Sequence, residues 1–155
     1  MLTIAETKEY KIIAELSEEV QNLHARLYPE IFKPYNKAEM EKQLESQLAQ
    51  PNYFGYVAQQ AGINVGSAVY HIKEVQENAF HYTLKTLHIE QLAVLNKFQK
   101  NGAGKILLRQ AEKIAQEHSI KKIELDHWHG NVVAASYFKK NGYALCKERL
   151  FKMIN

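Results

Sequence analysis

The sequence predicts a mixed α/β domain in which a mostly antiparallel sheet carries helices on both faces. Two observations predict it. Apolar residues recur at three- and four-residue spacing in several segments, and shorter alternating segments lie between turn residues. In addition, helices separate the strands in the second half of the chain, which favours parallel neighbours joined by right-handed crossovers. A length of 155 residues fits one domain, expected over 1–155.

The first third of the chain predicts one strand followed by two helices. Thr3–Glu6 has the composition of a short strand. Glu9–Leu27 carries apolar residues at helical spacing and predicts one continuous helix, ended by the prolines at 29 and 34. Lys37–Ala49 predicts a second, more polar helix that ends before Pro51.

The middle of the chain predicts a three-stranded antiparallel meander. Tyr53–Gln59 and Val65–Val75 read as two strands joined by a turn at Ala61–Gly62. Gln76–Lys85 is polar and predicts a loop, and Thr86–Val94 alternates as a third strand of the meander.

The last third predicts a helix, a strand, a helix and two closing strands. Gly102–Glu117 has a clear apolar face and predicts the best-defined helix of the chain. Lys122–His127 predicts a strand, and Val132–Lys140 a helix that stops at Asn-Gly. Tyr143–Lys147 and Leu150–Ile154 are expected to close the sheet as two further strands.

Composition argues against several classes of function. A net charge of +3 with interspersed signs gives no reason to expect nucleic-acid binding. Apolar runs are too short for a membrane span, Met1–Tyr10 is too charged for a signal peptide, and Cys146 is the only cysteine, so we expect a cytoplasmic protein. His127 and His129 alternate on one strand, but two ligands are too few, and no metal site is expected.

The chemistry is indicated by a turn with two glycines that leads from a strand into a helix. Gly102 and Gly104 allow unusual backbone angles and close approach of a ligand to the main chain. The first turn of a helix offers free N–H groups and partial positive charge, which suits a diphosphate, and Lys100 and Lys105 add charge. A plain strand-to-helix turn is the alternative reading. The spacing is neither that of a P-loop nor that of a dinucleotide-binding fingerprint.

This turn and a later segment together resemble the GNAT superfamily of acyl-CoA-dependent N-acyltransferases. The family patterns are [RQ]-x-x-G-x-[GA] and, further on, N-x-x-A-x-x-[FL]-Y-x-K-x-G-[FY]. The first is filled by Gln99, Gly102 and Gly104, and most of the second by Asn131, Ala134, Lys140, Gly142 and Tyr143. The expected order of elements also matches the GNAT fold from end to end.

The resemblance implies acetyl-CoA as cosubstrate, bound where the fourth and fifth strands splay apart. Main-chain groups of Leu92, Ala93 and Val94 would bind the pantetheine arm, and the N–H of Leu92 would stabilise the oxyanion. Asn131 would contact the pantetheine from the other side. The diphosphate would be held by the turn itself, formed by Gln99, Lys100, Asn101, Gly102, Ala103, Gly104 and Lys105.

Three residues are candidates for proton transfer. An ammonium must lose a proton before it attacks a thioester, and Glu90 and His88 lie on one face of the fourth strand, where GNAT enzymes carry a general base. The alternative is an exposed strand face without a catalytic role. The family tyrosine that protonates the leaving thiolate falls on Phe138, which we expect to pack beside the CoA arm. Tyr137, one residue earlier, is the remaining candidate acid.

The expected acceptor is the primary amine of a small molecule, with polyamines slightly favoured by the similarity of Ile89–Gly104 to bacterial diamine acetyltransferases. Acetylation of a protein or peptide amine is an alternative within the class. A non-catalytic acyl-CoA sensor, favoured by Phe138, and an interaction module that has lost the cofactor are alternatives outside it. GNAT proteins are often homodimers, but nothing in the sequence fixes the oligomeric state.

Overall fold

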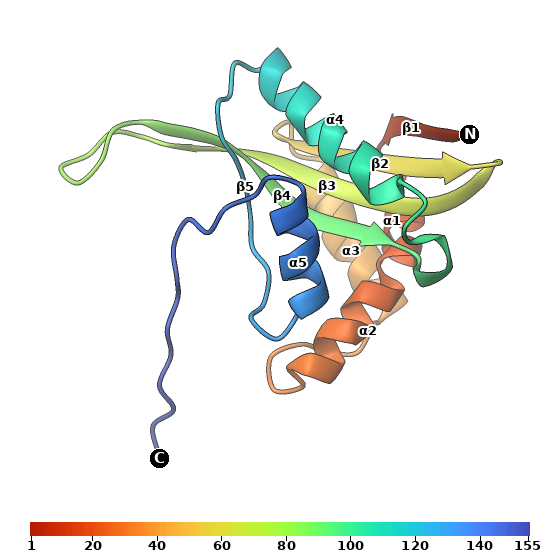
Figure 1. The fold of residues 1–155 in the computed structure, drawn as a ribbon, viewed down its shortest axis with the longest axis horizontal. Coiled ribbons are helices and arrows are strands. Elements are labelled where there is room, and N and C mark those ends of the chain that lie inside the picture. Colours follow the sequence, from red (N-terminus) through yellow and green to blue (C-terminus); the bar gives the residue numbers. More distant parts are fainter.

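The computed structural model describes residues 1–155, and its centre is one five-stranded sheet with the strands in chain order (Figure 1). The first four strands pair antiparallel, and the fifth pairs parallel with the fourth. The strands are β1 (Leu2–Thr7), β2 (Tyr53–Gln60), β3 (Ile63–Val75), β4 (Leu84–Val94) and β5 (Ile123–Leu125).

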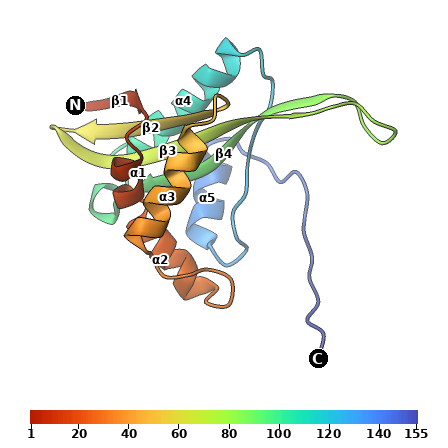
Figure 2. The same ribbon diagram turned by 180° about the vertical axis from the view of Figure 1, so that it is seen from behind.

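Helices cover both faces of the sheet, which confirms the predicted mixed α/β architecture. α4 (Ala103–Glu117) and α5 (Val132–Lys140) lie on the face nearer the viewer in Figure 1. On the opposite face, seen in Figure 2, lie α1 (Tyr10–Leu16), α2 (Glu18–Leu27) and α3 (Lys37–Leu48). No helix combines the length and the apolar character needed to cross a bilayer.

Each face of the sheet has its own apolar core. On the α4 face, Leu107 and Ile114 pack against the sheet, and the buried Tyr70 donates a hydrogen bond of 2.7 Å from its hydroxyl to the Leu107 carbonyl. On the other face, Ile13 of α1 and Leu44 of α3 pack over β2 and β3. The two cores hold β2 and β3 between them, and β4, whose Leu87 and Ile89 belong to the first core, pairs with β3.

The prediction of one helix over Glu9–Leu27 is wrong, because the helix breaks at Ser17. Its hydroxyl donates a 2.6 Å hydrogen bond to the carbonyl of Ile13, four residues earlier, and this kind of bond bends helices. The same hydroxyl accepts a hydrogen bond from the side chain of Gln91 in β4. The break therefore lies against the middle of the strand that carries the candidate site.

The fourth and fifth strands diverge, as predicted, but β5 is shorter than the predicted Lys122–His127. Pairing between them runs only from Leu87 with Ile123 to Ile89 with Leu125. Beyond Ile89, β4 continues to Val94 with β3 as its one strand neighbour. The divergence leaves the outer main-chain edge of β4 without a strand beside it.

The two closing strands predicted at Tyr143–Lys147 and Leu150–Ile154 are not formed by the chain on its own. Residues 143–155 carry no regular secondary structure, and the chain leaves the domain after α5 (Figure 1). The only residues between the two predicted strands are Glu148 and Arg149. Two-residue hairpin turns need positive φ angles, which favour Gly or Asn, and this pair has neither.

Candidate functional site

A β-bulge in β4 shapes the candidate site. Val69 of β3 pairs with Gln91 and Tyr70 pairs with Ile89, so Glu90 is an extra residue in β4. A bulge re-aims side chains and increases local twist, and bulges are frequent beside active sites. Here the bulge lies where β4 parts from β5, next to the open strand edge.

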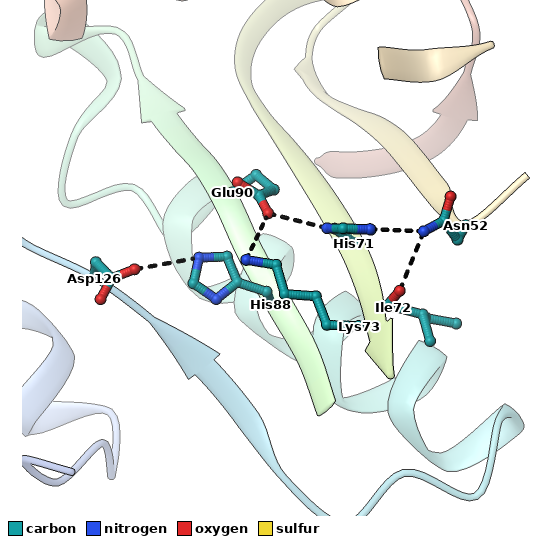
Figure 3. Close-up of polar contacts among 7 residues, drawn as sticks. All are labelled: Asn52, His71, Ile72, Lys73, His88, Glu90 and Asp126. Carbon is teal, nitrogen blue, oxygen red and sulfur yellow. Dashed lines mark hydrogen bonds and ion pairs between the residues drawn. The ribbon is translucent and has the colours of Figure 1, made fainter. Parts of the chain in front are cut away.

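Glu90 is the centre of a polar cluster on the face of the sheet covered by α1, α2 and α3. Its Oε1 lies 3.2 Å from Nδ1 of His71 and 3.3 Å from Nζ of Lys73, both on β3 (Figure 3). The His71 ring stacks on Tyr53 with a centroid separation of 4.0 Å. Glu90 is thus held by two neighbours on β3 and is not a freely solvated carboxylate.

Asn52 fixes the tautomer of His71. Its amide nitrogen donates to the Ile72 carbonyl at 3.3 Å and lies 2.6 Å from Nε2 of His71 (Figure 3). Since that nitrogen is a donor, Nε2 of a neutral His71 accepts, and its proton is on Nδ1 facing Glu90. The result is a chain of hydrogen bonds from Asn52 through His71 to Glu90.

His88 lies beside this cluster, on the same face as Glu90, and its side chain is 12% exposed. Burial, with a further contribution from the Lys73 charge, holds the pKa of His88 below its ordinary value of 6.5, although Glu90 and Asp126 act in the opposite direction. Its Nε2 lies 3.5 Å from Oδ2 of Asp126. The imidazole is therefore neutral at neutral pH and can accept a proton.

A groove of about 1080 Å³ runs along β5 and α5, and it contains His88. Phe138 and Asp126 also line it, so the residue at the family's tyrosine position shares a groove with the candidate base. Tyr137 does not line this groove. A Cβ atom placed on Gly104 would lie only 2.5 Å from the Tyr137 hydroxyl, which is buried without a hydrogen-bond partner. Burial raises the pKa of Tyr137.

The glycine turn has the backbone conformation that the sequence suggests. Lys100 and Gly102 have φ angles of 65° and 91°, and α4 begins directly after them without a side-chain cap. At the start of α4, the N–H of Ile106 donates a hydrogen bond of 3.0 Å to the Gly102 carbonyl. The N–H groups that precede Ile106 in the first turn of α4 have no acceptor within the helix. Such a helix start fits an anion.

Two predicted cofactor-binding residues have structural contacts of their own. The Gln99 side chain donates to the Val94 carbonyl at 3.3 Å and to Asn96 Oδ1 at 3.1 Å, which ties the turn to the end of β4. Asn131 Oδ1 accepts a hydrogen bond of 3.2 Å from Ala134 N–H and caps α5. Both side chains hold in place the backbone that the sequence predicts to contact CoA.

An aromatic cluster joins the α2–α3 connection to the β5–α5 loop. Trp128 lies 4.8 Å from Tyr28 and 5.2 Å from Phe32, measured between ring centroids. The Tyr28 hydroxyl accepts a 2.6 Å hydrogen bond from the N–H of Gly130. These contacts make the cluster a packing element between two loops, and Trp128 keeps 39% of its surface exposed.

The sequence matches the family model of the acetyltransferase (GNAT) family over residues 17–143. The chain belongs to the GNAT family. The match includes β4, the glycine turn and α5, together with the polar cluster around Glu90.

Curated relatives of this GNAT chain are similar over a limited stretch. A Bacillus subtilis (strain 168) protein named as an acetyltransferase is 32% identical over 60 residues, which are 39% of each chain. An uncharacterised N-acetyltransferase of Chlorobaculum tepidum is 29% identical over 70 residues, 45% of this chain and 42% of the relative. The matched region thus spans about two fifths of these relatives.

Solved structures are similar over the whole chain. A protein of Bacillus halodurans has a TM-score of 0.90 at 17% identity, covering 100% of this chain and 99% of its own. The protein AAC(6')-Iy, in complex with a CoA-linked bisubstrate analogue, has a TM-score of 0.73 at 14% identity, covering 100% and 99%. At these identities the likeness concerns the fold.

The sequence prediction missed the partners of Glu90. Asn52, His71 and Lys73 were not expected at the site, because their approach depends on the pairing of β2, β3 and β4. A signal was present: His71 and Lys73 alternate on the strand that precedes the polar loop, like His88 and Glu90 on the strand that follows. An antiparallel hairpin places such alternating pairs on one face.

Proposed function

We propose that this chain transfers the acetyl group of acetyl-CoA to the primary amine of a small molecule. The observation that carries the proposal is the placement of His88, a largely buried histidine with a lowered pKa, in one groove with Phe138 and beside the Glu90 cluster. A neutral imidazole next to fixed carboxylates suits deprotonation of a bound ammonium. Membership of the GNAT family supports the acyl donor.

The backbone of this chain fits CoA in two places. The uncapped start of α4, preceded by two residues with positive φ, fits the diphosphate through Lys100–Lys105. The open edge of β4 over Leu92–Val94 fits the pantetheine arm as an added strand. Asn131 supports this arrangement by fixing the start of α5. In this arrangement Phe138 packs beside the arm.

The reaction needs one proton acceptor and one oxyanion donor. His88 accepts a proton from the acceptor ammonium, with Asp126 stabilising the imidazolium that results. The freed amine attacks the thioester carbonyl, the C–N bond forms, the C–S bond breaks as CoA leaves as a thiolate, and the attacking nitrogen loses its second proton to solvent. The N–H of Leu92 stabilises the oxyanion. Glu90 holds the cationic acceptor, and it remains an alternative base.

The thiolate leaves without a tyrosine at position 138. A thiol titrates at about 8.5, so its anion is a tolerable leaving group near neutral pH. Tyr137 is the predicted acid, and its hydroxyl packs against Gly104 in the first turn of α4. A role in protonation would require α5 to shift, so solvent is the simpler proton source.

For the acceptor we favour a small cationic amine. Glu90, Asp126 and Glu124 place negative charge around His88, which suits a substrate that carries more than one ammonium group. Several proteins with similar folds are named as aminoglycoside N-acetyltransferases, which extends the panel to amino sugars. Polyamines are the first choice and peptide amines the alternative.

The test is an assay of CoA thiol release with saturating acetyl-CoA across diamines, polyamines, aminoglycosides and peptides. We expect turnover with at least one small polyamine. Glu90→Gln should raise the KM for that amine about tenfold or more, since it removes one charged contact. Turnover with peptides alone would contradict a small-molecule acceptor, while acetyl transfer itself would stand.

A second measurement separates catalysis from binding. Thermal stabilisation by CoA without turnover on any amine would favour the non-catalytic sensor, because a ligand above its Kd must stabilise the fold it binds. Absence of any stabilisation would contradict the proposed cofactor site itself.

A further inference from the structure

Asn52 is joined to Ile72 of β3 through both its main chain and its side chain. The Ile72 N–H donates a hydrogen bond of 2.9 Å to the Asn52 carbonyl, and Asn52 Nδ2 donates one of 3.3 Å to the Ile72 carbonyl. A flipped amide would place Oδ1 against that carbonyl, where two acceptors would repel each other. The side-chain nitrogen is therefore the atom that lies 2.6 Å from Nε2 of His71.

This contact bears on the charge of His71 as well as on its tautomer. An imidazolium carries a proton on both ring nitrogens, so a charged His71 would bring a proton on Nε2 against the N–H of Asn52. The ring has little freedom to turn away, since its side chain is 17% exposed and stacks on Tyr53 with an interplanar angle of 9°. Asn52 therefore favours the neutral form of His71.

Charged and titratable groups approach His71 from three strands. On β4 the Glu90 carboxylate favours a charged His71, and on β3 the Lys73 ammonium, at the same carboxylate oxygen, opposes it. On β2, burial and then the Glu90 charge raise the pKa of Tyr53, so the stacked phenol stays uncharged. Lys8 Nζ lies 3.4 Å from the Tyr53 carbonyl, and this second cation also disfavours a charged ring. Because these charges oppose each other, the balance depends on the amide donor at Nε2.

Both partners of Glu90 use one carboxylate oxygen. His71 Nδ1 and Lys73 Nζ lie 3.2 Å and 3.3 Å from Oε1, and Oε2 points away from both (Figure 3). The Glu90 side chain is 25% exposed, so Oε2 can accept hydrogen bonds from a bound molecule. With a neutral His71, one cation faces one carboxylate. A charged His71 would add a second cation at Oε1 and weaken the attraction of Oε2 for an ammonium.

We propose that Asn52 is a positioning residue of the candidate site: it holds His71 in the neutral form with its proton directed at Glu90 Oε1, and this keeps Oε2 negative and open to the ammonium of the acceptor. The hold on His71 follows from the contacts above, and its effect on the acceptor rests on the proposed function. The alternative is a network that only ties the three strands together, in which the charge of His71 has no effect on the acceptor.

The first test reads the protonation of His71 directly in the full chain. Long-range proton–nitrogen correlation spectra with isotope-labelled histidine distinguish protonated from bare ring nitrogens, and His71→Gln identifies the His71 signal among the seven histidines. We expect a proton on Nδ1 and a bare Nε2 in the neutral form. In Asn52→Ser the hydroxyl accepts as readily as it donates, so His71 should gain its charge at a higher pH than in the unaltered chain.

The second test measures the effect on the acceptor, using the amine that turns over best. The KM of Asn52→Ser, divided by that of the unaltered chain, should rise at least about threefold between about pH 8 and about pH 6, where histidines gain their charge. The kcat at high pH and the Kd for CoA should stay within about twofold. Glutamine donates a hydrogen bond but carries no charge, so Asn52→Ser/His71→Gln should remove the pH-dependent part of the KM rise.

The matched control is Asn64→Ser, because Asn64 also pairs through its side chain, accepting 2.7 Å from Gln59, but at the β2–β3 turn. It should change neither the His71 spectrum nor the KM. A proton on Nε2 of neutral His71 in the unaltered chain would overturn the proposal, as would equal titration of His71 with and without Asn52. A KM ratio that does not vary with pH would leave only the structural network. If no amine turns over, the proposed function fails, while the spectra still decide whether Asn52 holds His71 neutral.

Discussion

The candidate site is built from two regions that work by different means. The glycine turn at 99–105 uses main-chain groups, held by positive φ angles and by the start of α4. The polar cluster around Glu90 uses side chains from β3, β4 and the turn before β2, and depends on a bulge in β4. The glycine turn should tolerate most side-chain substitutions but not the replacement of a glycine that needs a positive φ angle. The cluster around Glu90 should be sensitive to side-chain substitutions that leave the backbone unchanged.

The largest expected effect comes from Gly102→Val. A branched side chain at a φ of 91° strains the backbone by about 1–3 kcal/mol, and relief of this strain would re-aim the N–H groups of the turn. We expect the Kd for CoA to rise about 100-fold, measured by calorimetry. Lys105→Ala, which changes only a side chain, is the control and should cost less than about tenfold. Unchanged CoA affinity in Gly102→Val would contradict the cofactor site.

The next effect belongs to the side-chain region. His88→Gln should lower kcat/KM by about 100-fold, because general base catalysis contributes roughly that much or more. The Kd for CoA should stay within about twofold, since no backbone changes. Steady-state assays with the best amine measure kcat/KM, and calorimetry measures the Kd for CoA. If CoA affinity fell by the same factor as kcat/KM, the substitution would have disturbed the structure of the site, and His88 would not be identified as the base.

The two regions also differ in how far the sequence predicts them. The turn could be predicted because glycine spacing and a helix start are local, and Gly102 has the expected backbone. The cluster could be predicted only for His88 and Glu90, which share one strand. His71 comes from β3 and Asn52 from the turn before β2, and their approach depends on register and on the bulge at Glu90. The break at Ser17 escaped prediction because apolar residues keep their helical spacing across it; the Ser17 hydroxyl bonds to Ile13 nearby and to Gln91, which is 74 residues away.

A smaller effect tests the boundary between the turn and α5. Gly104→Ala would place a Cβ atom 2.5 Å from the Tyr137 hydroxyl, and we expect a loss of about 1–3 kcal/mol in the free energy of unfolding. Tyr137→Phe removes that oxygen, so Gly104→Ala/Tyr137→Phe should recover most of the loss. Urea unfolding of the three variants measures this coupling. If Tyr137→Phe alone abolishes turnover while CoA still binds, Tyr137 has the acid role predicted from the sequence.

The smallest expected effect is a shift in pH dependence, and it has a defined sign. The positive charge of Lys73 disfavours the imidazolium form of His88 and so lowers its pKa, while the negative charge of Glu90 raises it. A base works when unprotonated, so kcat/KM falls as the pH drops through this pKa. Lys73→Met should therefore move the lower inflection of kcat/KM to higher pH, and Glu90→Gln should move it to lower pH. Lys73 and Glu90 lie 3.3 Å apart, and opposite shifts of the inflection in their two variants would assign the inflection to His88. If neither substitution moves the inflection, the base lies elsewhere, and the cluster only binds the acceptor.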